Sequence, residues 1–176
     1  MASLVDDIKQ LREETSCGVI ECKKALEEAK GDFQKAKDVL RKRGLELAAK
    51  KAGRVATEGR VEAYIHTGNK MGVVVEVNCE TDFVARNDDF IAFTRDVAMH
   101  IAAVAPKYVK KEDIPSDVLD KELDKEAFAK ANCLLLQAFV KDASKTVGEY
   151  LNQMISKTGE NVQIGRFIRF KIGEVL

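Results

Sequence analysis

The amino-acid sequence predicts an α+β fold, in which a segment of helices precedes a core with a small antiparallel sheet packed on helices. Three observations predict it. Apolar residues recur at helical spacing over residues 1–50, they alternate with polar residues after Gly59, and a second alternating segment ends the chain. The chain has 176 residues, of which 45% are hydrophobic and 33% charged. This length and composition are typical of a globular protein with a sizeable core.

Residues 1–54 are predicted to form three short helices around one small core, because helices of about ten residues are not stable alone. Ser3 and Asp6 resemble a capping box at the start of the first helix. Asp32 has the side chain to cap the third helix, Gly44 is expected to end it, and residues 44–59 then form a helical or frayed linker. The inward side chains recur at positions 4, 5, 8 and 11, at 19, 22, 25, 26 and 29, and at 33, 36, 39 and 40.

The alternating pattern that follows predicts a β-hairpin. Its apolar positions are 61, 63 and 65 on the first strand and 73, 75, 77 and 79 on the second, with Gly68 and Asn69 in the turn. A long helix is expected over residues 87–105, since Pro106 stops it. Another helix, mostly of charged residues, begins at Pro115, and a further one spans residues 146–157. The alternating segment 162–172 is expected to return to the hairpin as a terminal strand.

The charges of the chain balance, with 29 Lys and Arg against 29 Asp and Glu, so no global field attracts nucleic acid. Residues 1–54 carry a small basic excess, 13 basic against 10 acidic side chains. This excess is either a docking face or the solvated surface of a helix. Much of it lies in one run of side chains: Arg41, Lys42, Arg43, Lys50, Lys51 and Arg54.

Neither a cofactor nor a metal site is expected. The four Cys and two His have the spacing of neither a zinc site nor a thioredoxin-type centre, so the thiols should be reduced. His66 and His100 are expected at the surface or its boundary. No apolar run approaches the ~18 residues of a membrane span, and two Asp stand where a secretory signal would be basic and then apolar. The protein should therefore stay in the cytoplasm, or in the matrix if it comes from an organelle.

The segment EVNCETDFVAR, residues 76–86, stands out because a large aromatic, Phe83, lies among polar and charged side chains between a strand and a helix. Two interpretations follow from the residues alone. Either Asp82 caps a turn and Phe83 packs into the core, or Phe83 is exposed beside Asp82 and enters the surface of a partner, as aromatic hot spots do.

The same segment resembles the second signature of the elongation factor Ts family. The stretch LREETSCGVIECKKAL, residues 11–26, resembles the first signature of that family. The resemblance continues in FVKD at 139–142, TVGE at 146–149, GEN at 159–161 and RFIRF at 166–170, so that it covers nearly the whole chain.

This resemblance implies a translation elongation factor that is a guanine-nucleotide exchange factor and not an enzyme. Its partner would be elongation factor Tu, whose magnesium and phosphate site it disturbs so that GDP leaves and GTP can bind. It also implies a ubiquitin-associated-like three-helix module at residues 1–54 and an α+β core and dimerisation domain at 55–176. Carried over by motif, the partner-binding residues are Thr81, Asp82, Phe83 and Val84 in the core, and Val19, Cys22, Lys23 and Lys24 in the module.

The chain departs from long members of the family because it has one copy of the core where they have two. It is therefore similar to the short form, which acts as a homodimer. The small size of the core also favours a homodimer, because a small sheet leaves strand edges and apolar surface that a second chain can cover. The surface expected for this purpose comprises Leu134, Leu135, Leu136, Phe139 and Val140, and the terminal strand through Phe167 and Phe170. The region between Lys121 and Cys133 is shorter than in members of the short form, because this chain lacks most of a helical insertion that they carry.

Two functions of other classes compete with this one. A metal-dependent hydrolase would take its ligands from the carboxylates of Glu80, Asp82, Asp88 and Asp89, although Asp88 and Asp89 are also typical of the first turn of a helix. Alternatively, residues 1–54 form a generic module that binds nucleic acid or ubiquitin-like partners.

Overall fold

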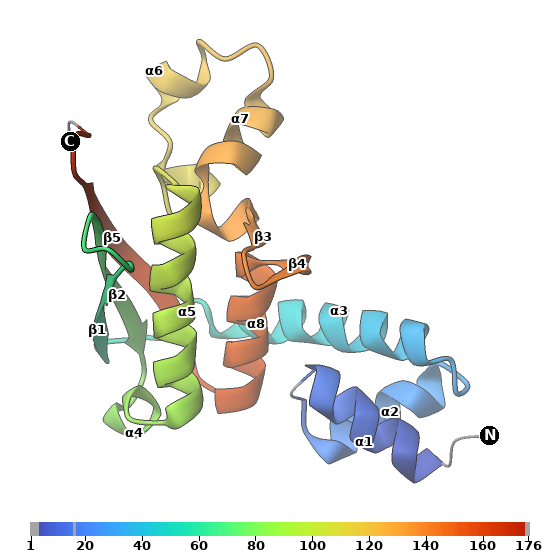
Figure 1. Ribbon diagram of the computed structural model, residues 1–176. Helices are drawn as coiled ribbons and strands as arrows, with labels where there is room; N and C mark the ends of the chain where they lie inside the picture. The colour runs from blue at the N-terminus through green and yellow to red at the C-terminus, as the bar shows by residue number, and fades with distance from the viewer. Residues whose placement is uncertain (1–3, 16, 175–176) are drawn as a thin grey trace. The chain divides into compact units, whose positions relative to one another are not determined.

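The computed structural model describes residues 4–15 and 17–174. It divides into two compact units. We call Met1–Arg54 with Asn152–Asn161 the helical unit, and Val55–Leu151 with Val162–Leu176 the sheet unit. The predicted α+β class is confirmed, with three helices first and a small antiparallel sheet after them (Figure 1). In the described part of the chain, no helix has both the length and the apolar character to span a membrane.

The helical unit contains the three predicted helices, α1 (Leu4–Thr15), α2 (Val19–Glu28) and α3 (Phe33–Lys51). Asp32 caps α3 as expected, because its Oδ1 accepts the Lys35 N–H at 3.0 Å. The capping box assigned to Ser3 lies outside the described residues. The shared core is apolar and comes from all three helices: Leu11, Cys22, Ala25, Leu26, Ala29, Ala36 and Leu40.

The prediction that α3 ends at Gly44 is wrong, since the helix continues to Lys51. A glycine inside a helix costs about 1 kcal/mol relative to alanine, so contacts beyond it must hold the last two turns. Those contacts come from the far end of the chain. The Lys51 ammonium donates to the Gly159 carbonyl, and Asn161 Nδ2 donates to the Arg54 carbonyl at 2.7 Å. Residues 152–161 therefore complete the helical unit.

The sheet unit is built on three antiparallel strands in the order β1-β2-β5. The strands are β1 (Glu58–Ile65), β2 (Met71–Cys79) and β5 (Gln163–Lys171). The predicted hairpin and the return of the terminal strand are both confirmed, because β2 pairs with β1 and with β5. Gly68 and Asn69 form the turn with left-handed φ angles of 90° and 54°, a conformation that glycine and asparagine adopt readily.

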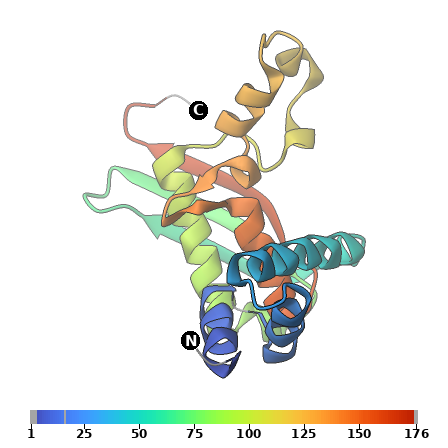
Figure 2. The same cartoon turned by 90° about the vertical axis from the view of Figure 1, so that its right-hand side faces the viewer.

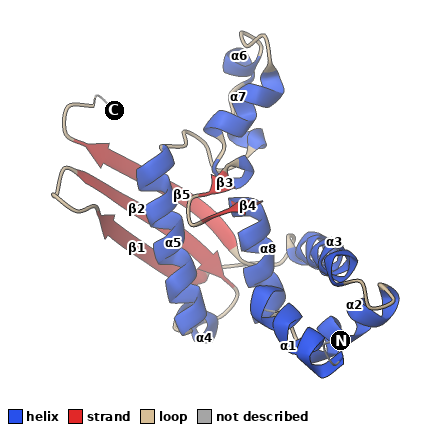
Figure 3. Ribbon diagram, turned by 45° about the vertical axis from the view of Figure 1, so that its right-hand side comes forward, coloured by secondary structure: helices blue, strands red, loops and turns tan. Residues whose placement is uncertain are grey.

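One face of the sheet packs on the long helix α5 (Asp88–Val104), which the sequence predicted over nearly these residues (Figure 3). Val73, Val75 and Val77 of β2 are fully buried on this side. The other face, which we call the open sheet face, carries apolar side chains from all three strands. Their exposed fractions range from 40% to 67%: Val61, Ile65, Val74, Ile168 and Phe170.

Between α5 and the last helix the chain forms short elements, most of which the sequence did not predict. They are η1 (Lys111–Asp113), α6 (Ser116–Leu119), α7 (Lys125–Asn132), η2 (Leu134–Leu136), β3 (Ala138–Phe139) and β4 (Asp142–Thr146). The single charged helix expected after Pro115 is thus two helices. Both lie near the C-terminal end of α5 (Figures 1 and 2). The last helix, α8 (Val147–Thr158), is confirmed.

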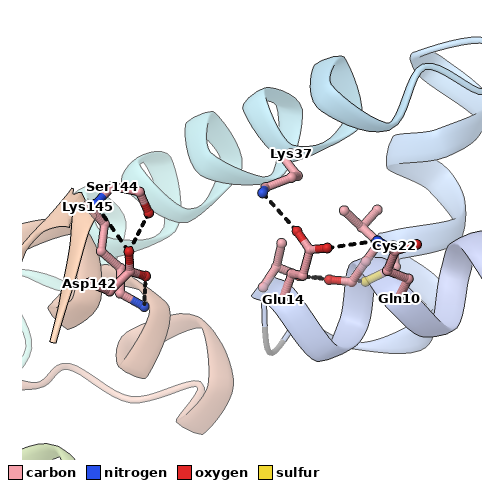
Figure 4. Close-up of polar contacts among 9 residues, drawn as sticks. Gln10, Glu14, Cys22, Lys37, Asp142, Ser144 and Lys145 are labelled. Carbon is pink, nitrogen blue, oxygen red and sulfur yellow. Dashed lines mark hydrogen bonds and ion pairs between the residues drawn. The ribbon is translucent and has the colours of Figure 1, made fainter.

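The β3–β4 hairpin has a local polar contact at its turn and an apolar contact with the core. Asp142 Oδ1 accepts from the N–H and the hydroxyl of Ser144 at 3.1 and 2.6 Å (Figure 4), and these bonds lower the pKa of Asp142. Leu134 and Phe139 are buried within the chain, at 0% and 4% exposure. The expectation that these two side chains leave apolar surface to cover is therefore wrong.

His100 is fully buried, which corrects its expected place at the surface or boundary. The imidazole is satisfied on both nitrogens, since Nε2 lies 3.0 Å from Gln137 Oε1 and Nδ1 accepts the Val140 N–H at 3.2 Å. A buried polar ring is tolerated when its hydrogen bonds are complete. His100 is thus a core residue that ties α5 to β3 and its turn.

Candidate functional site

The segment that the sequence singled out forms a single helical turn, α4 (Asp82–Ala85), between β2 and α5. Thr81 is its N-cap, with Oγ1 accepting the Val84 N–H at 3.4 Å and the carbonyl accepting the Ala85 N–H at 3.3 Å. The thiol of Cys79 donates to the same carbonyl at 3.1 Å. The end of the buried strand β2 therefore fixes where the turn begins.

Phe83 projects from this turn with 82% of its surface exposed. It is the most exposed aromatic side chain in the part of the chain that the structure describes. The interpretation in which Phe83 packs into the core is therefore wrong. A phenylalanine in water forgoes the roughly 1.5–3 kcal/mol that burial provides, so this position favours a partner's surface as its place of burial.

Asp82 and Val84 flank Phe83 and are half-buried. Asp82 is the first residue of α4, where a carboxylate is favourable, and the cap itself is Thr81. Its Oδ2 lies 3.1 Å from Arg86 Nη2. The structure thus places four of the expected contact residues on one turn, with the aromatic side chain outermost: Thr81, Asp82, Phe83 and Val84. Arg86 ends the same signature but was not among the partner-binding residues expected from it.

In the helical unit, the first turns of α2 carry the other expected contact residues. Val19 is 51% exposed and the next residue, Ile20, is 68% exposed, although only Val19 was named from the sequence. Lys23 and Lys24 lie on the surface in ion pairs with Glu27 at 3.8 Å and Glu21 at 3.9 Å. The adjacent position of Ile20 in the same signature was the signal that could have identified it.

Cys22 differs from these residues because it is fully buried. Its sulfur lies 4.0 Å from the Thr15 hydroxyl and 3.8 Å from the Cys17 carbonyl, and burial raises the pKa of the thiol. The side chain therefore packs α2 against its own unit, and a partner would meet the neighbouring lysines instead.

Two further basic side chains of the helical unit, Arg43 and Lys37, have contacts within that unit. Arg43 joins α3 to α2 by ion pairs with Glu28 at 2.7 Å and Glu21 at 3.3 Å. Lys37 donates to Glu14 at 2.8 Å and Gln10 donates to the same carboxylate at 3.0 Å (Figure 4). These two bonds, that of Lys37 first, lower the pKa of Glu14. Several of the charged side chains thus hold the three helices together.

The carboxylates proposed for a metal-dependent hydrolase do not form a ligand set. Over residues 4–15 and 17–174, no three His, Cys, Asp or Glu side chains gather closely enough to hold a metal ion. Asp88 and Asp89 occupy the first turn of α5, and Asn87 Oδ1 accepts the Asp89 N–H at 2.8 Å. Their place is the one that a helix N-terminus favours.

Comparison with known proteins decides the family. The model of the family described as elongation factor Ts matches residues 2–131 and 124–174. The chain belongs to the elongation factor Ts family. It is 50% identical over 192 residues to Elongation factor Ts of Carboxydothermus hydrogenoformans, which covers 96% of this chain and 88% of the relative. It is 49% identical over 201 residues to Elongation factor Ts of Geobacter metallireducens, covering 100% of this chain and 92% of the relative.

Membership of the elongation factor Ts family makes the chain a translation elongation factor. The aligned length of 201 exceeds the 176 residues of the chain, so this relative has residues without a counterpart here. The two segments matched by the elongation factor Ts family overlap at residues 124–131.

Proposed function

We propose that the chain is a guanine-nucleotide exchange factor that binds elongation factor Tu and promotes the release of GDP so that GTP can bind. The observation that carries the proposal is Phe83, an aromatic side chain 82% exposed on a turn inside a signature of the elongation factor Ts family. Aromatic anchors of this kind dominate protein interfaces when a partner buries them.

The chemistry required of the α4 turn is displacement and not bond breaking. Magnesium in a GTPase bridges nucleotide phosphates and protein ligands, so moving a ligand by about an ångström forfeits much of the nucleotide's affinity. Phe83 would enter between elements of the partner's nucleotide-binding domain, with Asp82 beside it. Thr81 and Val84 fix the turn that carries both.

Exchange then follows from linkage. A factor that binds the nucleotide-free GTPase more tightly than the nucleotide-bound form must weaken the nucleotide by the same ratio. The protein would accelerate release without any covalent step, so it is not an enzyme in this proposal. Exchange takes place where the GTPase works, which we take to be the cytoplasm or an organelle matrix.

The helical unit would add affinity for the same partner. Val19 and Ile20 offer apolar surface on the first turn of α2, and Lys23 and Lys24 offer positive charge one turn later. An apolar centre with charged side chains at its rim is the usual composition of a protein interface.

A second copy of the chain would cover the open sheet face. On that face Ile65 and Phe170 lie opposite Gly72 in one row, and Ala63 and Ile168 lie opposite Val74 in the next. Contiguous apolar surface of this kind is rare on monomers, and two sheets pack face to face about 10 Å apart. A two-fold axis would bring the same face of each copy together.

Release of a fluorescent GDP from elongation factor Tu tests the proposal. The wild-type chain should accelerate release, and Phe83→Ala should remove most of the acceleration. Leu123→Ala is the matched control, because Leu123 is fully exposed but lies outside the proposed contact residues. If the wild-type chain does not accelerate release, the proposed function is wrong.

A further inference from the structure

The α4 turn lies against β1, β2 and α5, but none of its own side chains is fully buried. Its backbone bonds are those of one helical turn, such as Arg86 N–H to the Asp82 carbonyl at 3.2 Å and Asn87 N–H to the Val84 carbonyl at 3.0 Å. A single helical turn is unstable in water, because nucleation fixes several residues for few hydrogen bonds. Polar side-chain contacts must therefore contribute to holding the turn that presents Phe83.

Arg86 supplies a contact that spans the whole turn. It is the residue that caps the C-terminal end of α4, and its Nη2 lies 3.1 Å from Oδ2 of Asp82, the first residue of the helix. An acidic residue four positions before a basic one is the favourable orientation for such a pair. The side chains are 80% and 46% exposed, so the pair adds little to global stability.

We propose that Arg86 is a positioning residue, which acts through Asp82 to preform the α4 turn and so present Phe83 to the partner. This inference rests on the proposed function. Ordering a loop at an interface opposes binding, so a loop already ordered in the free protein binds more tightly. A carboxylate has two oxygens, and the one that Arg86 does not hold stays available to a partner.

A double-mutant cycle tests the assignment. The variants are Arg86→Met, Arg86→Lys, Asp82→Ala and the double variant Asp82→Ala with Arg86→Met. The rate of GDP release from elongation factor Tu is measured against exchange-factor concentration at low and high salt. Lys121→Met is the matched control, since it removes an exposed pair of the same i,i+4 type, with Asp117 at 3.9 Å.

Arg86→Met should raise the concentration needed for half-maximal release by about two- to fivefold and leave the maximal rate unchanged. High salt should abolish the difference from wild type, Arg86→Lys should restore most of the affinity, and Lys121→Met should have no effect. In the Asp82→Ala background, Arg86→Met should cause no further loss.

If Arg86→Met raised the concentration for half-maximal release equally in the wild-type and Asp82→Ala backgrounds, Arg86 would contact the partner directly and the assignment would be overturned. The assignment would also be overturned if Arg86→Met and the wild type needed the same concentration at low salt. Neither result affects the proposed function, which depends on release by the wild-type chain and its loss in Phe83→Ala.

Discussion

His100 Nε2 lies 3.0 Å from Gln137 Oε1, and both side chains are buried. The other imidazole nitrogen accepts the Val140 N–H, and Gln137 Nε2 donates to the Ala131 carbonyl at 2.7 Å. The glutamine oxygen can only accept, so His100 Nε2 must carry the proton and Nδ1 must be free of one. These contacts require a neutral imidazole.

The stability of the chain should therefore fall as the pH is lowered below the unfolded His100 pKa of about 6.5. Burial lowers the pKa of His100 in the folded state, and the bond to Gln137 offsets only part of this. The unfolded state then binds more protons, so the contribution of His100 is complete above pH 6.5 and is lost as the pH falls towards the folded pKa. Urea unfolding between pH 5 and 7.5 measures this loss of unfolding free energy.

His100→Asn provides the control for this pH dependence. The variant should be less stable at pH 7.5, but its free energy of unfolding should change less over the same window. If the unfolding free energy of His100→Asn changed with pH as steeply as that of the wild type, the pH dependence would come from other groups.

Phe83→Ala should change the free energy of unfolding by less than about 1 kcal/mol, because its side chain is 82% exposed. Phe93→Ala is the comparison, since Phe93 is fully buried and truncation of a core phenylalanine costs about 3–5 kcal/mol. Urea unfolding of both variants measures the difference. Equal losses would show that Phe83 supports the fold.

Ile168→Asp should convert a dimer into a monomer, because it places a charge in the middle of the open sheet face. Light scattering at micromolar concentration should give about 39 kDa for the wild type, twice the 19.5 kDa of one chain, and the smaller mass for the variant. Leu123→Asp should remain a dimer, since Leu123 lies outside that face. A monomeric wild type with full exchange activity would contradict the dimer.

Asn161→Ala should lower the free energy of unfolding by about 1 kcal/mol, since it removes the buried donor to the Arg54 carbonyl. Gln10→Ala removes an exposed side-chain bond to Glu14 and should cost less than about 0.5 kcal/mol. Denaturant unfolding compares the two. Indistinguishable losses would mean that the contact with Arg54 does not stabilise the helical unit.

Elements with a long, uniform apolar period were predictable from the sequence. The apolar stripe of α5 and the alternating segments of β1, β2 and β5 identified these elements by type. The end of α3 was not predictable, because it depends on Gly159 and Asn161, more than a hundred positions away. The short strands β3 and β4 have no alternation to detect.

The sequence predicted which segment forms the candidate site, but not how the side chains of that segment are placed. The signature located the α4 turn, yet the residues alone left Phe83 either buried or exposed, and only its 82% exposure separates the two. The burial of Cys22 was visible in the helical period, which placed it on the inward stripe. The role proposed for Arg86 depends on the 3.1 Å distance between its Nη2 and Asp82 Oδ2, because residue spacing alone does not show that the ion pair forms.

The contact between Arg54 and Asn161 joins residues 107 positions apart and bears on synthesis by the ribosome. At roughly 5–20 residues per second, about a hundred residues take some 5–20 seconds to translate. During that interval the C-terminal turns of α3 lack the Gly159 carbonyl and the Asn161 amide that hold them. The helices α1 to α3 are thus made before residues 159–161, and the helical unit is completed only when these later residues emerge.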